Sequence, residues 1–329
     1  MTVDWWQLRH AYGRATDTPA HLRALEVGDA GAREAALDHL RVAVLHQGFP
    51  ETATAPAIEA VTALLAEGRA HPDMVDALVE FVGDAALSVT VLAGDRHFAQ
   101  ELPDVAGAVA AAYPVVLALL EASAPDRALF YAEHLVAIAR TAPLVDQRQE
   151  LAVLVQDWLQ RGPGPRARWV RCLSQLGVDV RHLLCDPDPA VTLQAALGHE
   201  DDPRSQQLIL DALGQPPPAG LHQSELIAAA IRVASGFDAI APAACEIAKR
   251  DSWTGFDDRW GALVRFAFAE PYGPRQPLTG SQRALLHALV ANDQLWDSRN
   301  GGCGLVFKQA GLPHRRDACR LLAGDAPSP

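Results

Sequence analysis

The stretch DPDPAVTLQAALGHEDDPRSQQLILDAL, from Asp186 to Leu213, decides the fold of this chain. Asp188 and Pro189 precede one apolar run, and Asp202 and Pro203 precede a second. An aspartate side chain accepts hydrogen bonds from the first free amides of a helix, and proline is tolerated in the first helical turn. The stretch therefore predicts two short helices joined by a tight Asp-rich turn, which is the unit of a helical repeat array.

A second segment has the same layout as the first half of this unit. The residues from Asp29 to Leu40 read DAGAREAALDHL, and those from Asp188 to Glu200 read DPAVTLQAALGHE. Both segments run from an aspartate into an Ala-Ala-Leu core and then reach a histidine, His39 or His199. Because self-similarity within one chain is the signature of repeat architectures, this pair supports an array of helical units.

Apolar residues follow the period of a helix in most of the chain. Sets at positions i, i+3, i+4 and i+7 begin at Val75, Leu151 and Ile227, and each set places one apolar stripe on a helix. Thr279 and Gln282 have the spacing of a capping box, which marks a helix start. The pattern predicts about fifteen helices, joined by short turns that favour antiparallel neighbours. We therefore expect an all-α fold.

The Asp186–Leu213 unit resembles a HEAT repeat, and the whole chain is similar to the Ala- and Arg-rich HEAT-repeat-containing proteins of actinobacteria. The similarity extends to Tyr12-Gly13 near the start and to Trp296 and Asn300-Gly301 near the end. It implies a HEAT-like α-α superhelix, a solenoid of antiparallel helix pairs over residues 1–329, and a binding role. It implies no catalytic residues, because that group shares no activity.

The length of the chain bears on its division into domains. A chain of 329 residues exceeds the ~250–300 residues at which a single core stops growing, whereas a repeat array has no such limit. The sequence Gly-Pro-Gly-Pro at residues 162–165 breaks the helical pattern. We expect one continuous array with a weak joint there, between N-terminal repeats in 1–161 and C-terminal repeats in 166–329.

Composition restricts the classes of partner. The formal net charge is −12, and an acidic surface repels nucleic-acid phosphates and anionic lipids. We therefore expect another protein, and a basic one, as partner, with nucleic acid disfavoured. The five cysteines are an odd number without a CxxC pair, which predicts reduced thiols in a cytoplasmic protein.

Two segments bear on membrane targeting. The N-terminal residues Met1–Trp6 lack the basic and apolar regions of a signal peptide. The most apolar run, Val105–Leu120, has 16 residues, short of the ~20 needed to cross a bilayer, and contains Pro114. We expect a buried helix pair here and no membrane association.

The most unusual segment places two carboxylates, Asp257 and Asp258, between two indoles, Trp253 and Trp260, with Arg259 beside them. Carboxylates next to aromatic walls are used by the HEAT-like alkylpurine DNA glycosylases to hold a cationic damaged base. The simpler interpretation is that both aspartates favour the positive end of a helix while Trp260 anchors the core. We prefer the core interpretation and keep the five residues as candidates for binding a ligand or partner.

A Gly-rich segment containing Trp296 and Asn300 precedes a predicted helix, whose backbone amides are suited to holding an anion. Its spacing matches neither a phosphate-binding loop nor a dinucleotide fingerprint, so we interpret it as a turn with candidate binding residues. Cys303, His314 and Cys319 are too loosely spaced to predict a zinc centre. We expect no metal and no cofactor.

His39 and His46 lie seven residues apart and are expected on one face of one helix. No second ligand stands at the i, i+4 spacing of a helical metal pair, so both histidines are interpreted as structural or surface groups. Catalysis by a Ser/His/Asp set has no support either, because no G-x-S-x-G elbow is present.

Two functions from different classes follow. The first is a protein-binding HEAT-repeat scaffold with a concave acidic surface, serving as an immunity-type or regulatory partner protein. The second is an enzyme, DNA-glycosylase-like or lyase-like, that uses the solenoid groove as its pocket. An Asp converging with indoles in a deep pocket would favour the enzyme, and a broad acidic face would favour the binding protein, which we prefer.

Overall fold

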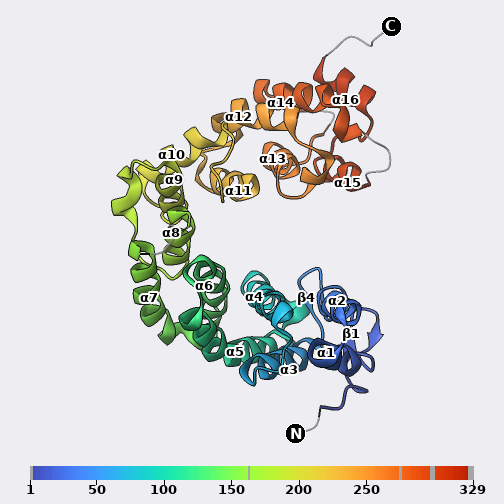
Figure 1. The fold of residues 1–329 in the computed structure, drawn as a ribbon. Helices are drawn as coiled ribbons and strands as arrows, with labels where there is room; N and C mark the ends of the chain where they lie inside the picture. Colours follow the sequence, from blue (N-terminus) through green and yellow to red (C-terminus); the bar gives the residue numbers. More distant parts are fainter. Residues whose placement is uncertain (1–2, 162–163, 274–275, 297–300, 325–329) are drawn as a thin grey trace. The chain divides into compact units, whose positions relative to one another are not determined.

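The chain folds into helices. A computed structural model describes residues 3–161, 164–273, 276–296 and 301–324 (Figure 1). Helices make up 71% of the structure, and the described ranges contain sixteen α-helices and two small two-stranded sheets. The all-α expectation is confirmed. Contacts divide the chain into two compact units, Met1–Val178 and Asp179–Pro329, which are called the first and second unit below.

The first unit holds eight of the α-helices. Their bounds are α1 Thr18–Val27, α2 Ala30–His39, α3 Thr54–Ala66, α4 Val75–Val91, α5 Leu102–Ala122, α6 Pro125–Ala139, α7 Arg148–Arg161 and α8 Arg166–Gln175. Shorter elements are the strands β1 Arg9–His10, β2 Gly13–Arg14, β3 Leu45–His46 and β4 Phe49–Pro50, the π-helix η1 Leu40–Val44, and the 3-10 helices η2 Pro72–Met74, η3 Arg96–Phe98 and η4 Ala142–Gln147.

The helices of the first unit form two layers. α1, α3 and α5 pack in sequence in one layer, and α4, α6 and α8 pack in sequence in the other. The contacts of α5 with both α4 and α6 join the layers. Helices that are neighbours in the chain therefore pack against each other and against their second neighbours, as short loops between antiparallel helices require.

The second unit repeats this arrangement. Its helices are α9 Pro189–Leu197, α10 Pro203–Leu213, α11 Gln223–Val233, α12 Phe237–Arg250, α13 Trp260–Ala267, α14 Gly280–Ala291, α15 Gly301–Gln309 and α16 Arg316–Ala323, with 3-10 helices η5 Arg181–Cys185, η6 Trp253–Phe256 and η7 Asp293–Trp296. α10, α12, α14 and α16 pack in one layer, and α11, α13 and α15 pack in the other (Figure 1).

The Asp186–Leu213 stretch folds as expected, with α9 and α10 antiparallel across a short turn. The Asp188 carboxylate accepts a hydrogen bond from the Ala190 amide at 2.9 Å. The Asp202 carboxylate accepts from the amides of Arg204 and Ser205 at 2.8 and 3.2 Å. Each aspartate thus satisfies amides that a helix start leaves free, which is why this stretch specifies its structure locally.

The joint expected at residues 162–165 falls partly on residues 162 and 163, which lie outside the described residues. The helices on either side of it, α7 and α8, pack against each other inside the first unit. Trp158 of α7 and Trp169 of α8 stack with ring centroids 6.0 Å apart. The boundary between the two compact units follows Val178.

The apolar run with Pro114 forms one helix rather than the expected pair. α5 continues through Pro114 for 21 residues, because helices α3, α4 and α6 pack around it and outweigh the hydrogen bond that proline cannot donate. By length and composition α5 could cross a membrane, with a mean hydropathy of 1.9 over its most apolar window. Of that window, 44% is buried inside the protein.

The expectation that His39 and His46 share a helix is wrong. α2 ends at His39, η1 follows, and His46 lies in β3, which pairs with β4 through the turn Gln47-Gly48. Both turn residues have positive φ, 53° and 79°, as a two-residue hairpin of the primed type requires. The hairpin is too short to give a periodic pattern, so hydrophobic periodicity did not reveal it.

A glycine lets α4 and α6 approach closely around a half-buried histidine. A Cβ atom on Gly83 of α4 would lie 2.3 Å from Nδ1 of His134 on α6, and Phe130 packs edge-on against the imidazole at 4.6 Å. Burial lowers the pKa of His134, and Arg168 lowers it further, while Glu133 and Glu80 act in the opposite direction.

The folded chain is expected to lose stability on acidification through His134. Because its folded pKa is below the ~6.5 of an unfolded histidine, the unfolded chain takes up the proton first. The stabilising contribution is complete above pH 6.5 and is lost as the pH falls towards the folded pKa. Guanidinium unfolding midpoints at pH 7 and pH 5 should therefore differ more for the wild type than for His134→Gln. His97→Gln, which alters an exposed histidine, should behave as the wild type; an equal pH dependence in His134→Gln would contradict the assignment.

Candidate functional site

The segment singled out in the sequence starts with η6 and runs into α13. Trp260 is fully buried, and its indole packs against Phe307 with ring centroids 5.9 Å apart. The Nε1–H of Trp260 donates to the Ser252 carbonyl at 3.2 Å. Trp260 therefore lies in the core of the second unit, as the preferred interpretation requires.

The two aspartates of this segment do not converge with the indoles. Asp257 and Asp258 are exposed in the turn before α13, and the Arg265 guanidinium donates to the Asp257 carbonyl oxygen. Trp253 is 44% exposed, whereas Trp260 is buried, so the two indoles do not form matching walls. This placement differs from the aromatic-walled carboxylate that the glycosylase interpretation needs.

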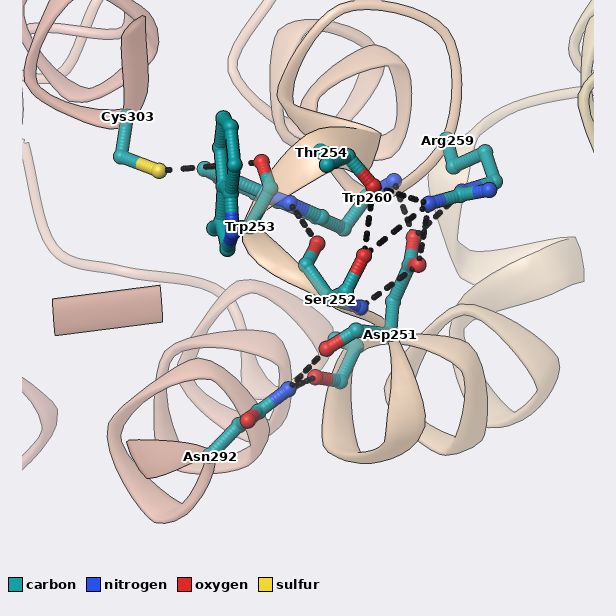
Figure 2. Close-up of polar contacts among 9 residues, drawn as sticks. Asp251, Ser252, Trp253, Thr254, Arg259, Trp260, Asn292 and Cys303 are labelled. Carbon is teal, nitrogen blue, oxygen red and sulfur yellow. Dashed lines mark hydrogen bonds and ion pairs between the residues drawn. The ribbon is translucent and has the colours of Figure 1, made fainter. Parts of the chain in front are cut away.

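The carboxylate that organises this segment is Asp251, which sequence reasoning missed. Figure 2 shows the Asp251 side chain facing the guanidinium of Arg259. The Nε of Arg259 lies 3.1 Å from Oδ2 of Asp251, and Nη2 lies 2.9 Å from Oδ1. The amides of Ser252 and Trp260 also donate to Asp251, at 2.8 and 3.4 Å. Asp251 therefore binds an amide at the start of α13 and holds η6 against that helix.

Gly255 lies so close to this ion pair that a residue with a side chain would not fit there. A Cβ atom on Gly255 would lie 2.3 Å from the Asp251 carboxylate and 2.8 Å from the Arg259 guanidinium. Asn292 at the end of α14 donates to the carbonyls of Ala248 and Asp251 at 2.8 and 2.7 Å (Figure 2). These contacts fix the end of α12 to α14, so their evident role is structural.

The Asp251–Arg259 pair also lines a cavity of about 290 Å³ in the second unit. Apolar atoms of Leu213, Pro216 and Ile247 form other parts of its wall. Both carboxylate oxygens of Asp251 already accept hydrogen bonds, so this group is poorly placed to take a proton from a bound molecule.

The remaining sequence candidates lie around α15. Trp296 stacks on Phe307 at 5.0 Å and donates through Nε1 to the Leu289 carbonyl at 2.9 Å. Asn300 lies outside the described residues. The thiols of Cys303 and Cys319 contact backbone carbonyls, those of Trp253 and Pro313, at 3.9 and 2.9 Å. Burial raises the pKa of Cys319 to about 12, which keeps it a neutral thiol.

The clearest site for a cationic group lies in the first unit, beside α3 and α5. A cavity of about 600 Å³, called the acidic cavity here, is lined by four carboxylates: Glu51, Glu59, Glu101 and Asp104. Within the described ranges, none of the four forms an ion pair. Its wall also contains apolar residues, namely Leu8, Ala55, Pro56, Pro103, Val105 and Ala108.

An exposed aromatic pair belongs to the same chain segments as the acidic cavity. Phe49 stacks on Phe98 with ring centroids 5.3 Å apart, and Phe49 is 44% exposed. Phe49 precedes Glu51 by two residues, and Phe98 precedes Glu101 by three. Aromatic side chains and carboxylates that belong to the same chain segments are a combination that suits a Lys or Arg side chain.

The acidic cavity had no sequence signal of its own. Its carboxylates come from the segment between β4 and α3, the middle of α3 and the start of α5, and the packing of α3 against α5 brings these parts together. The net charge of −12 indicated an acidic surface without locating it.

Comparison with protein families, with curated proteins and with solved structures finds no match for this chain.

Proposed function

We propose that this chain is a HEAT-like α-solenoid that binds a basic segment of another protein in the cytoplasm, and that the acidic cavity receives a Lys or Arg side chain of that segment. The observation that carries the proposal is the set of four carboxylates around one cavity, which make no ion pair with any residue that the structure describes. An immunity-type or regulatory role towards a basic protein agrees with it.

The packing order of the helices supports the solenoid part of the proposal. In each unit, several helices contact their second neighbours along the chain, as α3 contacts α5 and α12 contacts α14, and several contact their direct neighbours, as α5 contacts α6 and α9 contacts α10. Arrays of helix pairs pack in this order, and such arrays commonly serve as binding surfaces. The resemblance of the Asp186–Leu213 stretch to a HEAT repeat agrees with it.

Electrostatics supports a basic partner. Carboxylates that line a cavity together with apolar residues attract a cation whose aliphatic stem can be buried, as in Lys and Arg. Phe49, which stacks on Phe98, adds exposed aromatic surface, and aromatic residues are enriched at protein interfaces. The enzyme alternative has less support, because Asp257 and Asp258 are exposed and Asp251 is bound to Arg259.

The binding test uses a fluorescein-labelled peptide of alternating Gly and Lys residues, titrated with the full chain at low salt and followed by fluorescence anisotropy. In the double variant Glu59→Gln/Glu101→Gln we expect binding two- to thirtyfold weaker than in the wild type, because each exposed ion pair contributes ~0.2–1 kcal/mol. Added salt should weaken wild-type binding more than binding by this variant.

The matched control is Glu34→Gln/Glu121→Gln, which removes the same charge at exposed positions outside the acidic cavity. We expect it to bind nearly as the wild type does. An equal loss in both double variants would show that net charge alone attracts the peptide. That result, or an absence of binding by the wild type, would overturn the proposal.

A further inference from the structure

Two histidines and an aspartate from separate segments of the first unit meet at its N-terminal end. His10 lies in β1, Asp17 immediately precedes α1, and His39 ends α2. The His10 Nε2 lies 3.1 Å from Asp17 Oδ1, and the His39 Nδ1 lies 4.0 Å from Asp17 Oδ2. One nitrogen or oxygen atom from each of the three residues lies within 4.8 Å of those of the others.

The burial of this cluster is uneven. The side chains of His10 and His39 are only 6% and 8% exposed, whereas that of Asp17 is 52% exposed. Two polar rings are therefore held inside the unit while the carboxylate keeps one side open to solvent. An ion entering from that side would meet all three groups.

The side chain of Asp17 does not cap helix α1, although its position suggests that role. It is the N-cap residue of α1, yet its side chain accepts no capping hydrogen bond. Asp188 and Asp202, in the same position before α9 and α10, both cap their helices. The Asp17 carboxylate instead faces His10 and His39.

The other ring nitrogen of His39 already has a partner. Its Nε2 lies 2.9 Å from Oγ1 of the fully buried Thr18. With the proton on Nε2, donated to that hydroxyl, Nδ1 presents its lone pair towards Asp17. A metal-bound histidine typically has such a partner on its second nitrogen, which fixes the ring.

From this geometry we propose that His10, Asp17 and His39 form a binding site for one Zn²⁺ ion, with the remaining coordination position open to water. Two imidazoles and a carboxylate are ligands that zinc accepts, at metal–ligand distances near 2.0–2.2 Å. Tetrahedral ligands at that distance are about 3.3 Å apart, between the 3.1 and 4.0 Å separations found here.

Binding requires one rearrangement. The Nδ1 of His10 accepts a hydrogen bond from the Tyr12 amide at 3.1 Å, so its Nε2 carries the proton in the free protein. When Nε2 binds zinc, the ring proton moves to Nδ1 and the Tyr12 amide turns away. Tyr12 is exposed in the two-residue turn between β1 and β2, while the preceding amide of Ala11 stays bonded to the Ala43 carbonyl at 3.0 Å.

The site depends on packing rather than on a sequence motif, which is why the sequence predicted no metal. His10, Asp17 and His39 have no recognised metal-ligand spacing. The β1–β2 hairpin and the α1–α2 hairpin bring them together. This inference is independent of the proposed function at the acidic cavity.

The test is a calorimetric titration of the chelator-treated full chain with ZnCl₂, combined with thermal melts with and without zinc. We expect one zinc per chain and a rise in Tm, since a ligand that binds only the folded state stabilises it. Titration with Co²⁺ should give a visible absorption spectrum with nitrogen-ligand character.

Asp17→Asn and His39→Ala should weaken zinc binding at least tenfold and reduce the Tm rise accordingly. Asp17→Asn preserves the size of the side chain, so it separates ligand loss from misfolding. His97→Ala, which removes an exposed histidine elsewhere in the unit, should bind as the wild type does. The proposal is overturned if the wild type takes up no zinc, or if Asp17→Asn binds zinc as tightly as the wild type.

Discussion

Replacing Gly261 with alanine is expected to unfold the second unit or to cost more than ~4 kcal/mol of its stability, a loss reached only by severe backbone or core conflicts. Gly261 is the second residue of α13. A Cβ atom there would lie 1.6 Å from the carbonyl oxygen of Phe256 and 2.5 Å from its carbonyl carbon. Backbone atoms cannot rotate away as the end of a side chain can, so the turn between η6 and α13 would have to move.

Guanidinium unfolding followed by tryptophan fluorescence measures this effect. Gly280→Ala, at the start of α14, is the control, because a Cβ atom there would meet nothing within 4 Å. Alanine at such a position is expected to be neutral or to stabilise by up to ~1 kcal/mol. A Gly261→Ala chain with the unfolding midpoint of the wild type would show that η6 does not approach α13 this closely.

Trp260→Ala is expected to destabilise the second unit by ~3–5 kcal/mol, the usual cost of removing a buried tryptophan. The side chain is completely buried, packs on Phe307 and donates a hydrogen bond to the Ser252 carbonyl. Trp253→Ala, seven residues earlier, is the matched control, because its indole is 44% exposed. It should cost at most ~1 kcal/mol by the same measurement.

The same pair of variants tests the enzyme alternative. Trp260→Ala should leave binding of the basic peptide unchanged wherever the first unit stays folded, since the acidic cavity lies in that unit. A Trp260→Ala chain as stable as the wild type that had lost binding would contradict the core placement of Trp260. A ligand pocket at this segment would then be better supported as the binding site than the acidic cavity.

Local features were readable from the sequence because their causes lie within a few residues. The Thr279 hydroxyl accepts from the Gln282 amide at 3.1 Å, and the Gln282 side chain accepts from the Thr279 amide at 3.0 Å. This is the capping box that their spacing predicted. Asp188 and Asp202 cap their helices for the same local reason.

Predictions from the sequence were wrong or incomplete where contacts with distant segments outweighed the local pattern. Helix α5 continues through Pro114 because the surrounding helices pack against it. His46 lies in the β3–β4 hairpin and not in the helix that was predicted for it. Asp257 and Asp258 are exposed just before α13, as expected, but the carboxylate that binds the first amide of α13 comes from Asp251, which the sequence did not single out.

The sequence by itself determined the helical class, the starts of α9, α10 and α14, and the burial of Trp260, because periodicity and capping depend on neighbours three or four residues apart. The composition also determined that the net charge is negative. Only the tertiary structure decided where functional groups meet: Glu59 with Glu101 at the acidic cavity, and Asp17 with His39 at the N-terminal end. Those pairs are brought together by the packing of whole helices, which no local spacing encodes.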